Sequence, residues 1–141
     1  MGGSVIKIEG LEKTLARFDK KNYEPQIQKC FNDFGIRTEA KAKQNAFDNA
    51  HDNGLLAGSI FFDVIPLGSV VGARANYAAY VEFGTGPFAA KYVKQLPIEW
   101  QKYALTFYKN GKGRLPAHPY LYPAFNITKD MLLKDLQAIK L

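Results

Sequence analysis

A seven-residue stretch near the middle of the chain, residues 80–86 (YVEFGTG), carries residue types that could do chemistry. Its Gly-Thr-Gly end could cradle a phosphate, and Glu82, placed among aromatic residues, could act as a general acid. A P-loop, however, has a lysine directly after its last glycine, and here the next lysine is Lys91. The dinucleotide-binding pattern GxGxxG is also incomplete, and Pro87 follows the second glycine. A phosphate-binding loop is therefore disfavoured.

The other reactive side chains do not complete a catalytic set. Glu82 has no second carboxylate or histidine placed to share acid–base work. His51 and His118 lie far apart, and neither has Asp, Glu or Cys at metal-ligand spacing. Cys30 stands beside Phe31 on the apolar side of an expected helix, which favours a small buried thiol over a nucleophile. The sequence therefore predicts no enzyme, no metal and no cofactor. It favours Glu82 as a charged contact, within the chain or across an interface.

The elements that would position this stretch follow from hydrophobic periodicity and from the glycines and prolines. Residues 56–66 and 68–74 predict two strands joined by a tight Pro-Leu-Gly turn, a β-hairpin. Residues 76–84 predict a brief helix stopped by Gly84, with a strand as the alternative, because apolar residues also alternate there. The remaining expected elements are a strand over 5–9 and helices over 11–18, from Pro25 to about residue 50, over 97–109, and from Pro123 onward.

This order of elements predicts the fold class and the domain organisation. We expect an α+β fold in which a small antiparallel sheet packs against two or more helices, as a single domain over residues 1–141. The single cysteine excludes an internal disulfide and fits a reducing compartment. The sequence shows neither the apolar core of a signal peptide nor a run of about 18 apolar residues. We therefore expect a protein of the cytoplasm with no membrane contact.

The net charge of +6 is concentrated in residues 87–118, which hold six lysines and arginines against one glutamate. Aromatic residues are interleaved with these cations, a composition typical of surfaces that bind nucleic acid. Alternatively, the aromatic residues form the core face of the helix over 97–109, and their spacing favours this interpretation. For the cations, a surface that faces DNA or an acidic partner is an equally open hypothesis. The candidate cations are Lys91, Lys94, Lys112 and Arg114.

Three blocks of sequence then occur in order: NGLLAGSI (53–60), YAAYVEFGTG (77–86) and AHPYLYPAF (117–125). Together they resemble the head–tail joining family of long-tailed bacteriophages, whose members are called neck, tail-component or tail-completion proteins. That family shows a Val-Glu-Phe-Gly-Thr block, a variable insertion (here about residues 87–118) and a Pro-Phe-Leu-x-Pro-Ala-like block that opens the C-terminal helix. Tyr120 stands here in place of the usual Phe. Ala57 replaces an arginine often found in the first block, so a contact made by that arginine does not carry over.

The resemblance implies an α+β fold and a structural role without catalysis. Copies would assemble as a six- or twelve-fold ring where the DNA-filled capsid meets the tail, with neighbouring connector and tail proteins as partners. The protein would be located in the virion after assembly in the host cytoplasm. Residues 80–86 would form a turn whose glycines end a short helix and let the backbone pass close to a packed neighbour. The residues expected to pack within the chain or against another subunit are Tyr80, Glu82, Phe83, Gly84, Thr85, Gly86, Pro119, Tyr120 and Leu121.

Several alternatives stay open at this point. The ring could be a neck ring or a tail terminator that caps the tail tube. The basic segment could face genomic DNA in the channel without reading bases, or lie on the outside against an acidic capsid or tail ring. Two other functions compete with the structural role: a basic DNA-binding module unrelated to virions, and a small ribonuclease that would use His118.

Overall fold

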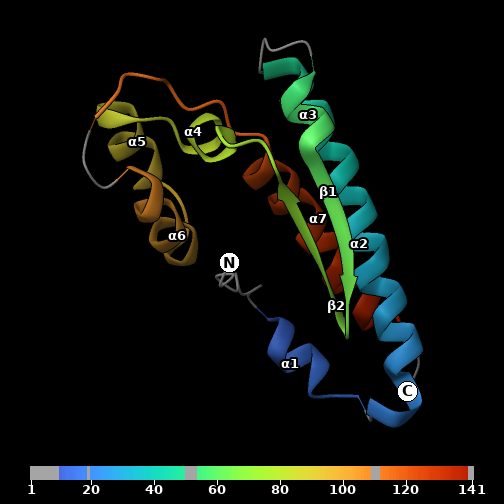
Figure 1. Ribbon diagram of the computed structural model, residues 1–141. Helices are drawn as coiled ribbons and strands as arrows, with labels where there is room; N and C mark the ends of the chain where they lie inside the picture. The colour runs from blue at the N-terminus through green and yellow to red at the C-terminus, as the bar shows by residue number, and fades with distance from the viewer. Residues whose placement is uncertain (1–9, 19, 50–53, 109–111, 140–141) are drawn as a thin grey trace.

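Two long helices and a β-hairpin form the larger part of the structure (Figure 1). Helices α2 (Lys20–Asn49) and α7 (Leu121–Gln137) pack against each other. The hairpin of β1 (Ile60–Ile65) and β2 (Gly68–Ala73) lies along α2. The computed structural model describes residues 10–18, 20–49, 54–108 and 112–139. This arrangement confirms the expected α+β fold with a small antiparallel sheet.

Short helices occupy the rest of the described chain. Helix α1 (Leu11–Leu15) precedes α2, and α3 (Leu55–Ser59) leads directly into β1. Helices α4 (Ala78–Phe83), α5 (Gly86–Val93) and α6 (Ile98–Tyr108) follow the hairpin and contact one another. We call residues 78–118 the α4–α6 lobe; it lies to the left of the hairpin in Figure 1. Among the residues that the structure describes, no helix combines the length and the hydrophobicity needed to cross a membrane.

Helix α7 contributes to each of three clusters of buried side chains. Between α2 and α7, the hydroxyls of Thr38 and Thr128 lie 2.7 Å apart, and each also lies within hydrogen-bond distance of a carbonyl oxygen one turn earlier in its own helix, so the two hydroxyl protons serve three contacts. The first cluster includes Phe18, Ile27, Phe31, Phe34, Leu132 and Leu136. The second includes Ala42, Leu56, Ile60, Ala78, Tyr120 and Ala124. The third is Phe83, Val93, Leu96, Trp100 and Ala104, with Tyr122 and Phe125 of α7 packed against it.

Gly35 shows why the hairpin can lie so close to α2. A glycine inside a helix costs about 1 kcal/mol relative to alanine, so its presence needs a reason. The reason is steric, because a β-carbon at this position would overlap the ring of Phe62 in β1. On the other face of the same strand, Phe61 covers Gly72, its partner in β2. The centroid of the Phe61 ring lies 3.9 Å from the guanidinium carbon of Arg74.

The brief helix ending at Gly84, the hairpin and the helix over 97–109 were predicted correctly, whereas other element boundaries were wrong. Helix α2 begins at Lys20 rather than at Pro25, which lies within its second turn at an exposed position. Residues 55–59 form a helical turn before β1 instead of strand. The expected strand over 5–9 lies outside the described residues.

Two further boundaries concern the segments around the candidate site. Helix α5 was not predicted; Pro87 stands in its first turn, and Ala89 and Val93 bury one side of it. Helix α7 begins at Leu121, two residues before Pro123, which had been expected to open it. The start of α7 depends on a contact with a distant part of the chain, which no local pattern could indicate.

Candidate functional site

The carboxylate of Glu82 lies at the N-terminus of α7. Its Oε1 accepts hydrogen bonds from the backbone N–H groups of Tyr120 (3.1 Å) and Leu121 (2.6 Å), and its Oε2 accepts one from Tyr122 (3.2 Å). Pro123 occupies the next position and has no N–H to donate. A helix leaves its first four N–H groups without partners, so this one side chain and this proline account for all four. Glu82 is thus the cap of α7, supplied from α4.

Tyr120 also stabilises the contact between α4 and the N-terminus of α7. Its ring is buried, and its hydroxyl donates to the carbonyl oxygen of Ala78 at the start of α4 (2.9 Å). Its own carbonyl oxygen accepts a bond from the side-chain amide of Asn45 in α2 (3.1 Å). The residue that precedes α7 is therefore held by α4 and α2 together. A phenylalanine at position 120, the usual residue in the family that the sequence blocks resemble, would keep the ring but lose the hydrogen bond to Ala78.

Residues 112–118 are bonded along the turn between α4 and α5. Thr85 donates its N–H to the carbonyl oxygen of Leu115 (2.9 Å), and the hydroxyl oxygen of Thr85 accepts from the N–H of Leu115 (2.8 Å). Three residues on, the N–H of His118 donates to the carbonyl oxygen of Val81 (2.8 Å). The His118–Val81 bond and the Glu82 cap join the second and third sequence blocks, and the two Thr85–Leu115 bonds hold the segment just before the third block.

Gly84 is required where the two blocks meet. Its φ of 78° and ψ of −173° lie in a region that residues with a side chain avoid. A β-carbon there would stand 2.8 Å from the backbone nitrogen of Ala117 and 2.9 Å from the carbonyl oxygen of Leu115. Gly113, also at positive φ, would bring a β-carbon against the Thr85 side chain. Sequence reasoning missed Gly113, whose only signal is a glycine in a polar loop.

The remaining predicted packing residues divide between core and surface. Phe83 is buried and meets Trp100 and Tyr103 at ring-centroid distances of 6.5 and 6.3 Å. Gly86 is buried at the first position of α5, whereas Pro119 and Leu121 are partly buried. Tyr80 is different: it is 41% exposed, on the outer side of α4. The structure therefore places most of this set inside its own chain and leaves Tyr80 available to a neighbour.

Burial dominates the ionisation of Glu82. The side chain is 2% exposed, and no ion pair among the described residues includes it. Removal from water raises the pKa of Glu82 from 4.5 to about 7, although the three backbone N–H groups act in the opposite direction. The same burial, with the charge of Glu82 nearby, also raises the pKa of Tyr120. These neighbours bind and position the carboxylate; they do not include a second group with which it could share acid–base catalysis.

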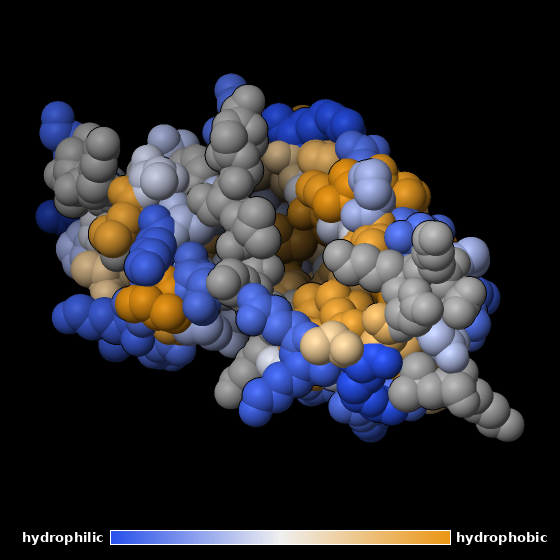
Figure 2. All heavy atoms as spheres, turned by 90° about the horizontal axis from the view of Figure 1, so that it is seen from below, coloured by the Kyte–Doolittle hydropathy of each residue, from blue (hydrophilic) through white to orange (hydrophobic). Residues whose placement is uncertain are grey.

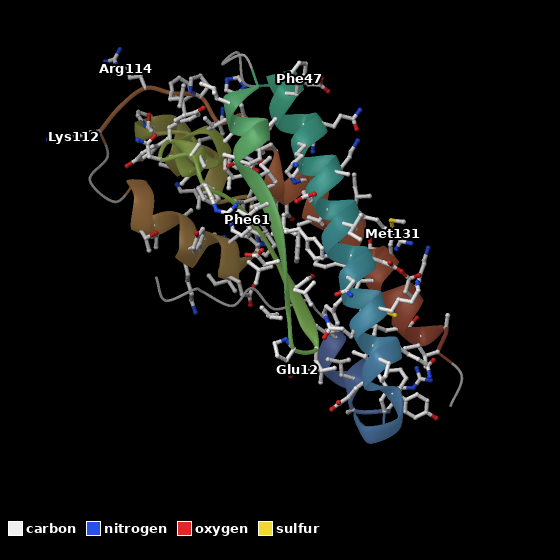
Figure 3. The ribbon with its side chains drawn as sticks, turned by 45° about the vertical axis from the view of Figure 1, so that its right-hand side comes forward. Glu12, Phe47, Phe61, Lys112, Arg114 and Met131 are labelled. Atoms are coloured by element: carbon white, nitrogen blue, oxygen red, sulfur yellow. The ribbon has the colours of Figure 1, made fainter. Side chains whose placement is uncertain are left out.

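The predicted cations lie on the surface of the α4–α6 lobe. Lys91 is in α5 and Lys94 follows its last residue, and both are exposed. Lys112 and Arg114 flank Gly113 in the segment bonded to Thr85, and Figure 3 shows both side chains pointing away from the body of the molecule. The fold thus brings two parts of the basic segment to the two ends of one short helix.

The remaining candidates for a chemical role are metal-binding side chains, Cys30 and a cavity at the hairpin turn. The part of the chain that the structure describes holds no group of three His, Cys, Asp or Glu side chains that could bind a metal. Cys30 is buried in the first core cluster, as the sequence predicted for a small buried thiol, and burial raises the pKa of this thiol. An open cavity of about 330 Å³ at the hairpin turn is lined by Glu24, Pro25, Gln28, Pro66 and Leu67. Gln28 is engaged there in fixing the turn.

Comparison of the chain with family models, with curated proteins and with solved structures finds no match in any of the three. The function is therefore inferred from the geometry of the chain itself and from the resemblance of its sequence blocks.

Replacing Glu82 with glutamine should change how stability depends on pH. Because burial raises the pKa of Glu82 from 4.5 to about 7, the folded chain binds a proton in this window that the unfolded chain has released. The free energy of unfolding of the wild type should therefore fall relative to Glu82→Gln as the pH rises through the window, by about 3 kcal/mol at most. Urea unfolding of both proteins between about pH 4 and 8 measures this difference.

Glu99→Gln is the matched control, since Glu99 lies in the first turn of α6 and is partly exposed. It makes the same chemical change at a partly exposed carboxylate and provides the baseline for the Glu82→Gln difference. A Glu82→Gln difference that is constant, or that grows as the pH rises, would contradict the assignment of burial as the dominant influence.

Gly84→Ala should destabilise the fold more than Gly10→Ala. Both glycines have a similar positive φ, of 78° and 84°, but a β-carbon on Gly10 would meet nothing within 4 Å. We expect Gly10→Ala to cost about 1 kcal/mol from backbone strain alone. Gly84→Ala should cost about 1–3 kcal/mol more, because it also collides with the backbone of residues 115–117. Equal losses in urea unfolding would show that the two blocks do not meet closely at Gly84.

Proposed function

We propose that this chain is a structural protein of the phage head–tail junction, and that it works by forming a ring with further copies of itself. One observation carries the proposal most strongly. The two blocks on which the resemblance mainly rests, residues 77–86 and 117–125, are bonded to each other through Glu82 and Val81. Blocks that depend on each other in this way are unlike two chance matches, which would have no reason to meet in the fold.

Exposed apolar side chains support a role in protein–protein contacts. Orange, hydrophobic atoms gather in a hollow of the face seen in Figure 2, with hydrophilic side chains around them. A monomer that works alone keeps such surfaces small, whereas assembling proteins use them as interfaces. Over the described chain, the large apolar residues with more than half of their surface exposed include Ile36, Phe47, Leu55, Val64, Ile98 and Ile127.

The hairpin offers a second kind of contact between copies. The N–H of Arg74 donates to the carbonyl oxygen of Ser59 (3.0 Å), so this pair, one step beyond Ile60 and Ala73 in the register, is hydrogen-bonded. Bonded and non-bonded pairs alternate in an antiparallel ladder. The backbone groups of residues 60, 62 and 64 and of residues 69, 71 and 73 therefore point outward. Within the described residues neither edge has a third strand, and an unpaired edge is a template for another chain.

We propose no catalytic role for the chain. Glu82 is committed to the N-terminus of α7, where its carboxylate accepts three backbone hydrogen bonds. A tail terminator would need the same interlocked blocks and the same kinds of contact between copies. It is therefore kept as the alternative position of the ring, to be separated from a neck ring by experiment.

Electron microscopy of lysates tests the proposal. The gene is disrupted in the phage that encodes this chain, and a plasmid copy of the wild-type gene serves as the matched control. DNA-filled heads lying apart from tails of normal length are expected, because a missing joining ring blocks the final docking of two finished parts. The plasmid copy should restore infectious particles.

The other outcomes are equally informative. Detached tails of abnormal length would identify a terminator instead of a neck ring. Normal numbers of infectious particles without the gene would contradict a structural role at the junction.

A further inference from the structure

Four exposed cations of the α4–α6 lobe, Lys91, Lys94, Lys112 and Arg114, lie around the two ends of α5, and we call them the basic surface; Lys102 in α6 is also exposed. Thr85, the residue before α5, is bonded to Leu115 in both directions, and Gly113 lies against its side chain. This places Lys112 and Arg114 at the start of α5, while Lys91 and Lys94 lie at its end. A helix of eight residues is about 12 Å long. Both pairs of cations can therefore contact a single partner at the same time.

No carboxylate neutralises this surface within the described chain. The ion pairs that the structure shows join residues of α2 to one another or to α7: Lys29 with Asp33, Lys43 with Glu39, and Arg37 with Asp135. In the lobe, the acidic residues are Glu82, which is buried, and Glu99 at the start of α6. The whole chain is also cationic, with a net charge of +6. A partner that neutralises these cations must be anionic.

The aromatic residues of the basic segment decide which anion fits best. Trp100 is 3% exposed and packs edge-on against Tyr122 and Phe83. Tyr92 and Tyr103 are partly buried against the same cluster. Single-stranded nucleic acid is bound by rows of exposed aromatic rings that stack on successive bases, and these rings are turned into the core. Among the aromatic side chains of residues 87–118 whose burial the structure describes, Phe88 on α5 is the exposed one, at 44%.

We propose that this basic surface binds double-stranded DNA through its phosphates, without reading the base sequence. Duplex DNA carries one negative charge per about 1.7 Å of its axis, so a surface of this length faces several phosphates at once. Four exposed cations on flexible side chains provide attraction but no fixed donor pattern for base edges. That this DNA is the packaged genome rests on the proposed function; the binding itself does not.

The test is fluorescence anisotropy with the purified chain and two labelled duplexes of equal length and unrelated sequence. We expect equal affinity for the two duplexes and a steep loss of affinity with salt. With four phosphate contacts, the log–log slope is about −3.6, or roughly a 100-fold loss between 50 and 200 mM salt. Lys112→Glu with Arg114→Glu should reduce the magnitude of the slope by about 2 and weaken binding at least tenfold.

The matched control is Lys13→Glu with Lys134→Glu, which makes the same change in net charge at exposed positions of α1 and α7. Circular dichroism checks that both double variants fold. Equal losses in the two variants would show that only net charge matters, and would overturn the proposed surface. So would tighter binding to a single strand than to the duplex, or binding to polyglutamate without binding to DNA, which would indicate an acidic protein partner. None of these results bears on the gene-disruption experiment, so the two proposals can fail separately.

Discussion

The buried carboxylate of Glu82 at the N-terminus of α7 is the contact on which the rest of the structure depends. Helix α7 supplies Leu132 and Leu136 to the first core cluster, Ala124 to the second and Phe125 to the edge of the third, and Tyr120, which precedes it, also belongs to the second. Its starting residue sets which of its side chains faces each cluster. That start is fixed by Glu82, which belongs to α4 and to a different sequence block. One side chain therefore positions both the α4–α6 lobe and the helical body.

This contact involves two large opposing effects. Burying a carboxylate without a counter-ion is costly, and the raised pKa of Glu82 reflects that cost. Hydrogen bonds to a charged group each contribute about 1.5–3 kcal/mol, and the favourable end of the α7 dipole adds to them. Without the acceptor, three N–H groups of residues 120–122 would lie inside the protein with no partner. A buried glutamate is tolerated here because it costs less free energy than three buried N–H groups without an acceptor.

The parts of the fold that are encoded locally could be predicted from the sequence. The hairpin follows from two apolar runs around a Pro-Leu-Gly turn, and α4 ends at Gly84 because the chain there needs a conformation that glycine tolerates. The start of α7 could not be predicted, because it is decided by a residue 38 positions before Tyr120. Helix α5 was missed because Pro87 and the glycines around it are typical of loops as well.

The candidate site was predicted in part. Glu82 was expected to make a charged contact, within the chain or with a neighbour, and the structure shows an intramolecular cap. Tyr80 is exposed, whereas Phe83, Gly84 and Tyr120 are buried in their own chain. The partners Leu115 and Gly113 lie in a segment that was treated as a variable insertion, and nothing in its composition distinguishes them. The sequence thus pointed to Glu82 and Thr85 as packing residues, but not to the residues between 115 and 122 with which they form hydrogen bonds.

The described part of the chain carries exposed apolar side chains, a hairpin without a third strand, and exposed cations around α5, and these are the features from which we propose a ring subunit. The most direct test of this proposal is a single-particle reconstruction of the neck in intact virions of the phage that, on the proposal, encodes the chain. The account predicts a closed ring of copies of this fold between the capsid connector and the tail tube. Particles that are infectious and complete, yet contain no copy of this chain, would contradict it.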